Sequence, residues 1–398
     1  MKILLCHNYY RQRGGEDQSF DDEARLLESN GQEVIYYTRH NDDTRGMNRW
    51  TLATRIIRNR ETYGELRRII RRHRPDVLHC TNTFLLLSPA VYDAARQERV
   101  PVVQALRNYR LLCPAAILMR DGQVCEDCLR RKVPWPGIRH ACYRNSRLAT
   151  AAVAAMLCFD RWRKSRASAV SMYYTPSEFA RGKFIEGGFP AERIAVKPNF
   201  IASDPGVGSG RGGYAVFVGR LSKEKGIDTL LAAWSRLKEP LSLKIIGNGP
   251  LEEQVRRAAA TDDRIEVLGA RPIGEVLSVI GDAICLVMPS VCYETFGRVI
   301  AEAFAKGTPV VASRLGAPAE LVADGETGLL FEPGDADNLA LKVRQLTRDG
   351  DALTAMRKAA RHEYEQKFTA ESNHDGLMAI YRQALAAANS NGDMVSVQ

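Results

Sequence analysis

Residues 283–314, with the sequence AICLVMPSVCYETFGRVIAEAFAKGTPVVASR, contain the unit that decides the fold of this chain. An apolar run at 283–290 leads into a loop, and residues 297–306 then place apolar side chains at helical spacing. A second apolar run follows at 308–314. Two short apolar runs joined by a helix predict two parallel strands, because parallel strands require a crossover connection.

The same alternation extends along most of the 398 residues and predicts an α/β protein with two doubly wound units. The predicted strands lie at 2–8, 33–39, 76–82, 100–106 and 169–177 in the first unit, and at 214–221, 241–249, 265–270, 283–290 and 308–314 in the second. A Gly-, Pro- and Ser-rich stretch at 196–213 predicts the seam. We therefore expect one domain at 1–200, completed by a helix at about 373–390, and another at 201–372.

The composition is that of a globular protein, with 45% hydrophobic and 26% charged residues. No apolar run reaches the roughly 18 residues of a spanning helix. The start, MKILLCHNYY, resembles a buried strand rather than a signal peptide. We therefore expect a cytoplasmic protein with mainly reduced cysteines. The net charge of +9 favours anionic partners, although solubility alone also accounts for it.

Several polar side chains follow predicted strands of the second unit, where ligands of open parallel sheets bind. Arg220 and Lys225 lie between a strand-end glycine and a helix, an arrangement that suits phosphate. Taken alone, basic loop residues are usually just solvated. The turn IIGNGP, at 245–250, allows close approach of the backbone to a ligand, but such turns are often structural.

Two carboxylates, Glu294 and Glu302, flank the predicted start of the helix at 297–306. Separately, Glu294 is explained as a helix cap and Glu302 as a surface residue. Together they suggest more, because a helix N-terminus binds anions and carboxylates accept hydrogen bonds from hydroxyl groups. A nucleoside diphosphate linked to a sugar contains both an anionic group and hydroxyl groups, so it matches both features.

Four segments in order resemble the retaining glycosyltransferases of family 4, also called glycosyl transferases group 1. They are GRLSKEKGIDTLLAAW at 219–234, IIGNGPLEEQ at 245–254, ETFGRVIAEAFAKGTPVVAS at 294–313 and GETGLLFEPGD at 325–335. The spacing of Glu294 and Glu302 resembles the family's signature. YYRQRGGEDQ, at 9–18, resembles its glycine-rich loop, and VKPNFI, at 196–201, its hinge. The resemblance implies the GT-B architecture, in which two facing Rossmann-like domains enclose a cleft.

The resemblance also implies an enzyme that moves a hexose, with retention and without a metal, from a nucleotide-diphosphate sugar to a saccharide or lipid-linked acceptor. The nucleotide would be UDP or GDP, and the pathway cell-surface polysaccharide or glycoconjugate synthesis. The first domain would hold the acceptor and the second the donor. The implied catalytic residues are Glu294, Arg220, Lys225 and Arg107; the donor-binding residues are Gly14, Gly15, Gly219, Gly247, Asn248, Phe296, Gly297 and Glu302; the acceptor-side residues are His7 and Glu16, with Asp17 nearby.

The segment ALRNYRLLCP, at 105–114, departs from the family pattern. Relatives commonly carry a histidine where this chain has Arg107. Three interpretations stay open: Arg107 keeps a hydrogen bond to the transferred sugar, favours an acidic sugar or acceptor, or lowers the activity.

Four cysteines, Cys113, Cys125, Cys128 and Cys142, are spaced in a way that suits structural zinc or disulfides. Thiols are the favoured interpretation, and we expect no resident cofactor. The arginine-rich segment at 55–76 predicts an amphipathic helix. It would either lie on an anionic membrane at the inner face or pack on its sheet, which is slightly favoured.

Two alternatives remain beside the transferase: a nucleotide-sugar epimerase of the same fold, and a protein that binds anionic ligands without transferring sugar. The epimerase requires a different catalytic set near the donor, which the sequence does not contain. A nucleic-acid binder predicts aromatic strips or a helix-turn-helix pattern, neither of which stands out, and we expect no nucleic-acid partner.

Overall fold

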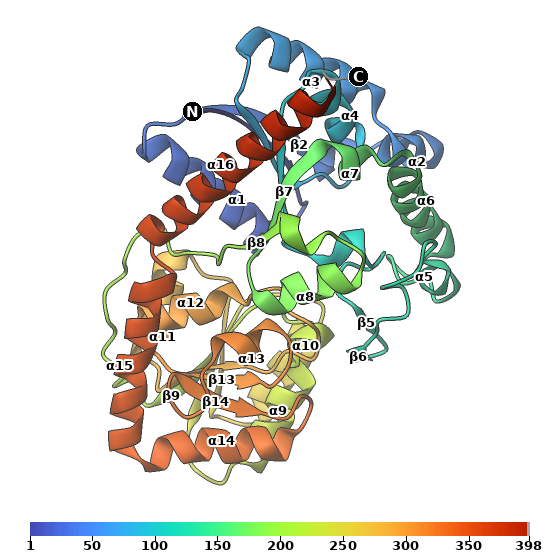
Figure 1. The fold of residues 1–398 in the computed structure, drawn as a ribbon. Helices are drawn as coiled ribbons and strands as arrows, with labels where there is room; N and C mark the ends of the chain where they lie inside the picture. The colour runs from blue at the N-terminus through green and yellow to red at the C-terminus, as the bar shows by residue number, and fades with distance from the viewer. Residues whose placement is uncertain (396–398) are drawn as a thin grey trace. The chain divides into compact units, whose positions relative to one another are not determined.

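The computed structural model describes residues 1–395 and divides into two compact units. Unit 1 comprises Met1–Ile117, Glu126–Lys197 and the chain from His374 onward, and unit 2 comprises Leu118–Cys125 and Pro198–Asn373. Each unit is built on a six-stranded sheet in which every pairing is parallel (Figure 1). The predicted class, two doubly wound α/β units, is confirmed.

The sheet of unit 1 has the strand order β2-β1-β3-β4-β7-β8. Its strands are β1 (Lys2–Tyr9), β2 (Glu33–His40), β3 (Val77–Asn82), β4 (Val102–Ala105), β7 (Val170–Thr175) and β8 (Ile194–Val196). Five of these strands correspond to predicted ones. The sixth, β8, was missed because three residues are too few to show a periodic pattern.

The helices of unit 1 connect these strands and cover both faces of the sheet. They are α1 (Gly15–Ser29), α2 (Arg49–Ile57), α3 (Arg60–His73), α4 (Ala90–Gln97), α5 (Trp135–Arg139), α6 (Arg147–Arg163), α7 (Ser165–Ala169), α8 (Glu178–Glu186) and most of α16 (Ala370–Val395), with 3-10 turns η1 (Asn41–Thr44), η2 (Tyr109–Leu111) and η3 (Ala191–Arg193). From the end of the chain, α16 brings Leu377 and Tyr381 into one core with Ile3 and Leu5 of β1.

The predicted basic helix at 55–76 is two helices rather than one. The chain leaves α2 at Ile57, and the side chain of Asn59 caps the start of α3 by accepting hydrogen bonds from the backbone of Glu61 and Thr62. Within α3, Leu66 and Ile70 are buried in the unit. The apolar stripe of α3 is therefore part of the core, as expected for an ordinary amphipathic helix.

The sheet of unit 2 has the order β11-β10-β9-β12-β13-β14. Its elements are β9 (Tyr214–Val218), η4 (Lys223–Lys225), α9 (Ile227–Arg236), β10 (Ser242–Ile246), α10 (Glu252–Thr261), β11 (Ile265–Gly269), α11 (Ile273–Asp282), β12 (Cys285–Met288), α12 (Arg298–Ala305), β13 (Val310–Ser313), α13 (Ala317–Leu321), β14 (Gly328–Phe331), α14 (Ala336–Arg348) and α15 (Gly350–Lys367). The unit also contains the hairpin β5 (Met119–Arg120) and β6 (Gln123–Val124).

Both faces of the second sheet are covered. Along β9, Ala215 and Phe217 belong to one apolar core, whereas Tyr214 and Val216 belong to the other. A strand buried on both faces has a continuous apolar run instead of an alternating one, which explains why these strands were predictable. Within residues 1–395, none of the helices combines the length and the apolar character needed to cross a bilayer.

Candidate active site

The carboxyl ends of β9 and β10 lie against each other through two glycines. The backbone amide of Gly219 donates to the carbonyl of Ile246 at 3.0 Å. A Cβ atom built on Gly247, whose φ is +137°, would lie 1.9 Å from the carbonyl oxygen of Gly219. Glycine at 247 is therefore required for the two strand-end loops to meet. Arg220 and Asn248 follow these glycines and are exposed.

A lysine and a glutamate form an ion pair beside these loops. Lys225, at the end of η4, places its Nζ atom 2.5 Å from Oε1 of Glu294, which lies in the loop after β12. Ser290 Oγ donates to the same carboxylate oxygen at 2.8 Å. Burial opposes the charged form of Lys225, but the attraction of Glu294 outweighs it and raises the pKa of Lys225. Lys225 thus keeps its positive charge beside Glu294.

The start of α12 supplies the remaining groups. Gly297 is the N-cap residue with φ +84°, and a Cβ atom there would lie 2.7 Å from Cε of Met288. The ring of Phe296 is buried against Phe368, with 5.7 Å between the ring centres. Phe296 therefore anchors the loop through its ring, and only its backbone remains for ligand contact.

Glu302 lies in the second turn of α12 and is buried, so it is not the surface residue that one interpretation suggested. Arg298 places Nε 3.2 Å from Oε1 of Glu302, one helical turn away. Neither Arg298, the partner of Glu302, nor Ser290, the partner of Glu294, was predicted from the sequence. The four-residue spacing of Arg298 and Glu302 was a usable signal for the first, whereas nothing in the sequence pairs Ser290 with Glu294.

The predicted donor residues of unit 2 thus follow three adjacent strands. Because the carboxyl ends of parallel strands meet at one edge of a sheet, the loops after β10, β9 and β12 lie together there. The edge offers two cationic side chains, two carboxylates and a helix N-terminus. This set can bind a diphosphate and several hydroxyl groups.

In unit 1, the predicted glycine-rich loop precedes α1. Gly14 is the N-cap residue in an extended conformation, and a Cβ atom on Gly14 or Gly15 would meet nothing within 4 Å. The fold of the unit alone therefore does not explain these glycines. The adjoining Glu16 accepts hydrogen bonds through Oε2 from Tyr10 and from Asn108, both at 2.9 Å.

The predicted acceptor-side role of His7 receives no support from its position. His7 is fully buried, with one ring nitrogen 2.8 Å from Oδ1 of Asp17 and the other 3.0 Å from Oγ1 of Thr81. Its ring stacks on Phe20 with 4.4 Å between centres. His7 thus holds the start of α1 to the sheet, and Asp17 is buried with it.

Arg107 occupies a buried network of charges rather than an open site. Its side chain is 5% exposed, and a guanidinium nitrogen lies 2.6 Å from Oε1 of Glu23. Lys197 Nζ approaches the same oxygen at 2.5 Å, and the hydroxyl of Tyr174 donates to this carboxylate as well. Arg107 therefore serves as a counter-ion of Glu23, an outcome absent from the three sequence-based interpretations.

The network has strong electrostatic effects. Burial opposes the charge of Glu23, but Arg107 and Lys197 outweigh it and hold the pKa of Glu23 well below its usual range. Burial, assisted by Arg107, lowers the pKa of Lys197 to about 8. Burial also lowers the pKa of His79 to about 4, so this ring is neutral between the hydroxyls of Tyr174 and Tyr381, at 3.0 and 2.8 Å.

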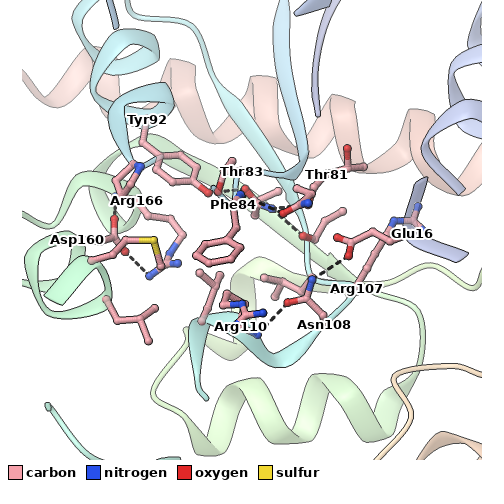
Figure 2. Close-up of a pocket in the computed structure, with 18 residues that line it drawn as sticks. Glu16, Thr81, Thr83, Phe84, Tyr92, Arg107, Asn108, Arg110, Asp160 and Arg166 are labelled. Atoms are coloured by element: carbon pink, nitrogen blue, oxygen red, sulfur yellow. Dashed lines mark hydrogen bonds and ion pairs between the residues drawn. The ribbon is translucent and has the colours of Figure 1, made fainter. Parts of the chain in front are cut away.

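A cavity lined by both polar and apolar side chains adjoins the network at the carboxyl ends of β3 and β4 (Figure 2). Glu16, Thr81, Arg107, Asn108 and Arg110 are among the residues that line it. Its volume is about 40 Å³, roughly enough for up to three water molecules. As it stands the cavity accommodates water or a small polar group, not a sugar ring.

The four cysteines singled out in the sequence lie in the region 113–142. Cys113 and Cys128 are buried, and Cys125 and Cys142 are partly exposed. Among residues 1–395, no group of three or more His, Cys, Asp or Glu side chains is placed to hold a metal ion.

The fold defines a class: a protein of two Rossmann-like units, the second of which carries cations, carboxylates and a helix N-terminus at the carboxyl ends of its strands. Residues 208–363 match the family model described as glycosyl transferases group 1, and residues 14–199 match the glycosyl transferase 4-like domain. Together these matches span most of the chain, which therefore belongs to the group 1 (GT4-like) glycosyltransferase family with the GT-B fold.

Relatives and solved structures agree with this assignment. The D-inositol 3-phosphate glycosyltransferase of Corynebacterium urealyticum is 35% identical over 180 residues, 42% of this chain and 42% of the relative, so the chain matches less than half of that protein. HepE from Anabaena, solved with UDP, covers 98% of this chain and 100% of its own at 19% identity, with a TM-score of 0.67. Sucrose-phosphate synthase from Thermosynechococcus elongatus covers 97% and 99% at 18% identity, with a TM-score of 0.71.

Proposed function

We propose that this protein is a retaining, metal-independent glycosyltransferase that moves a sugar from a nucleotide-diphosphate sugar to a saccharide or lipid-linked acceptor. The observation that carries the proposal is the Lys225–Glu294 ion pair at the strand ends, beside exposed Arg220 and the start of α12. Such a site supplies cations for a diphosphate and carboxylates for hydroxyl groups without help from a metal ion.

In this proposal each group of unit 2 has one task. Arg220 and Lys225 bind the diphosphate, and the backbone at Gly297 adds the N-terminus of α12. Glu302, fixed by Arg298, accepts hydrogen bonds from the ribose hydroxyls, and Glu294, fixed by Ser290, accepts them from the sugar. Gly219, Gly247 and Asn248 provide a strand-end surface on which the base lies.

In the proposed reaction, the protein must stabilise the negative charge that develops on the leaving diphosphate. As the bond between the sugar and the diphosphate breaks, its electron pair moves to a phosphate oxygen, where Arg220 and Lys225 stabilise it. The acceptor hydroxyl forms the new bond on the same face of the sugar and gives its proton to that phosphate oxygen. Retention by this route needs no protein nucleophile.

We assign the acceptor side to unit 1, at Glu16, and keep Gly14 and Gly15 of the adjoining loop as donor-binding residues. Oε1 of Glu16 is buried without a hydrogen-bond partner among the described residues, whereas Oε2 is fixed by Tyr10 and Asn108. A buried carboxylate oxygen in this state is suited to accept a hydrogen bond from a hydroxyl group. Arg107 is assigned a positioning role, because its guanidinium is bound to Glu23.

The pathway and the location stay as the sequence suggested: synthesis of cell-surface polysaccharide or glycoconjugate, in the cytoplasm or at the inner face of the membrane. The deciding experiment incubates the protein with a panel of UDP-, GDP- and ADP-sugars and saccharide acceptors and identifies products by mass. A product heavier than the acceptor by one sugar supports the proposal. An isomerised donor would identify an epimerase, and unchanged donors with no thermal shift by any nucleotide would overturn the proposal.

A further inference from the structure

Helix α6 exposes an apolar stripe on the side opposite its buried face. Val153 and Leu157 point into a core cluster of unit 1. On the other side, Leu148 is 80% and Trp162 is 77% exposed. The residues between them at helical spacing, Ala151, Ala155 and Phe159, are also apolar and at least partly exposed. A soluble helix normally places polar side chains on such a face.

Two helices that neighbour α6 carry further exposed tryptophans. Both α2 and α5 pack against α6, and Figure 1 shows the three together along one side of unit 1. Trp50 at the start of α2 is 85% exposed, and Trp135 at the start of α5 is also exposed. We call Trp50, Trp135, Leu148, Phe159 and Trp162 the α6 surface. Large exposed apolar side chains on α6 and on the two helices that contact it are unusual and indicate an interaction site.

Apart from Trp50, the α6 surface lies within a strongly basic segment of the chain. Residues 129–164 contain nine Lys and Arg and a single acid, Asp160, whereas the whole chain has a net charge of +9. Asp160 is buried and paired with Arg166. The exposed cations of the segment are Arg130, Arg131, Lys132, Arg139, Arg144, Arg147 and Lys164. The partner of this surface must therefore be both apolar and negatively charged.

We propose that the α6 surface docks on an anionic lipid bilayer. Tryptophan suits the boundary between lipid headgroups and acyl chains, because its ring is apolar and its N–H is polar. Apolar burial and attraction of Lys and Arg to acidic headgroups add to each other in such binding. The proposal rests on exposed side chains of unit 1 and is independent of the proposed transferase activity.

Other occupants fit less well. A second copy of the chain in a two-fold contact would bring the same cations face to face and incur repulsion. A nucleic acid would use the cations, but phosphate contacts give no role to Leu148 and the alanines between it and Trp162. A bilayer uses both features at once.

The test is co-sedimentation of the full chain with vesicles of phosphatidylcholine alone and of phosphatidylcholine with roughly one-third phosphatidylglycerol. We expect binding to the acidic vesicles, weakened by salt. Leu148→Glu and Trp162→Glu should each reduce the partition coefficient by about tenfold or more, because each removes apolar contact and adds repulsion. The matched control, Leu341→Glu, changes a residue of α14 that is 54% exposed and should bind as the wild type does.

Two vesicle results would overturn the proposal: wild-type protein that stays in solution with acidic vesicles, or variants that bind as strongly as the wild type. A dimer of the wild type that the variants abolish, seen by sedimentation velocity, would show that the surface binds a second copy. Oligonucleotide binding by the wild type that the same variants abolish would show that it binds nucleic acid. The thermal shift by UDP, measured on the same proteins, reports the folded donor site separately. Its absence from wild type and variants alike would count against the proposed function and leave the vesicle result intact.

Discussion

The guanidinium of Arg107 lies 2.6 Å from Oε1 of Glu23, an oxygen that also binds the ammonium of Lys197. Two buried cations thus share one buried carboxylate. Each side chain comes from a different element of unit 1: α1, the loop after β4, and the residue following β8. The network therefore links the sheet to α1 and depends on Glu23 for its charge balance.

Replacing the shared carboxylate should destabilise the protein. Glu23→Gln leaves Arg107 and Lys197 buried without a counter-charge, and we expect a loss of about 3–5 kcal/mol in the free energy of unfolding. Urea denaturation followed by circular dichroism measures this loss. The control, Glu28→Gln, alters a carboxylate of the same helix that pairs with exposed Tyr36. If both variants unfold at the same urea concentration, the network does not hold unit 1 together.

His79 should make stability fall as the pH is lowered. Its pKa is lowered to about 4 in the folded protein, whereas an unfolded histidine titrates near 6.5. Between these values the unfolded chain binds one more proton, so this residue's contribution to the free energy of unfolding decreases from pH 6.5 down to 4, by roughly 3 kcal/mol at most.

His79→Gln removes that titration and keeps a side chain able to bond Tyr174 or Tyr381. Other groups titrate in the same range, so the informative quantity is the difference in slope between wild type and variant. Denaturation at several pH values provides it. Parallel slopes would show that His79 does not titrate as its burial implies.

Both side chains of the Lys225–Glu294 pair should be essential for sugar transfer. Lys225→Ala removes charge stabilisation of the departing phosphate, and Glu294→Ala removes the partner of the sugar hydroxyls; we expect each to lower kcat/KM by about a hundredfold or more. Turnover is measured on whichever donor the mass screen identifies. Lys223→Ala is the matched control, because Lys223 belongs to the same turn and is exposed. Equal losses in Lys223→Ala and Lys225→Ala would mean a general effect of charge instead of a specific site.

Most of the fold was predictable because its strands are buried on both faces and so form unbroken apolar runs. The failures occurred where local sequence carries little information. β8 has three residues, too few to distinguish from a loop. β14 was also not predicted, although β12 and β13, which were, have the same length of four residues. The division between α2 and α3 depends on Asn59, whose capping hydrogen bonds are visible only in the folded chain.

The site residues also differ in how far the sequence alone predicts their surroundings. The donor residues of unit 2 were predicted together because they lie in short linked motifs. The ion pair of Arg107 with Glu23 was not predicted, because Glu23 lies far away in sequence and meets Arg107 only in the folded unit. The exposed stripe of α6 was missed because both faces of that helix are apolar, and only packing determines which one is covered.

The participation of α16 in the core of unit 1 has a consequence during synthesis on the ribosome. Ile3 and Leu5 are synthesised long before their packing partners Leu377 and Tyr381. The continuous segment Pro198–Asn373 emerges before them. The second unit is therefore able to fold before the core of the first is complete, because that core includes side chains of α16.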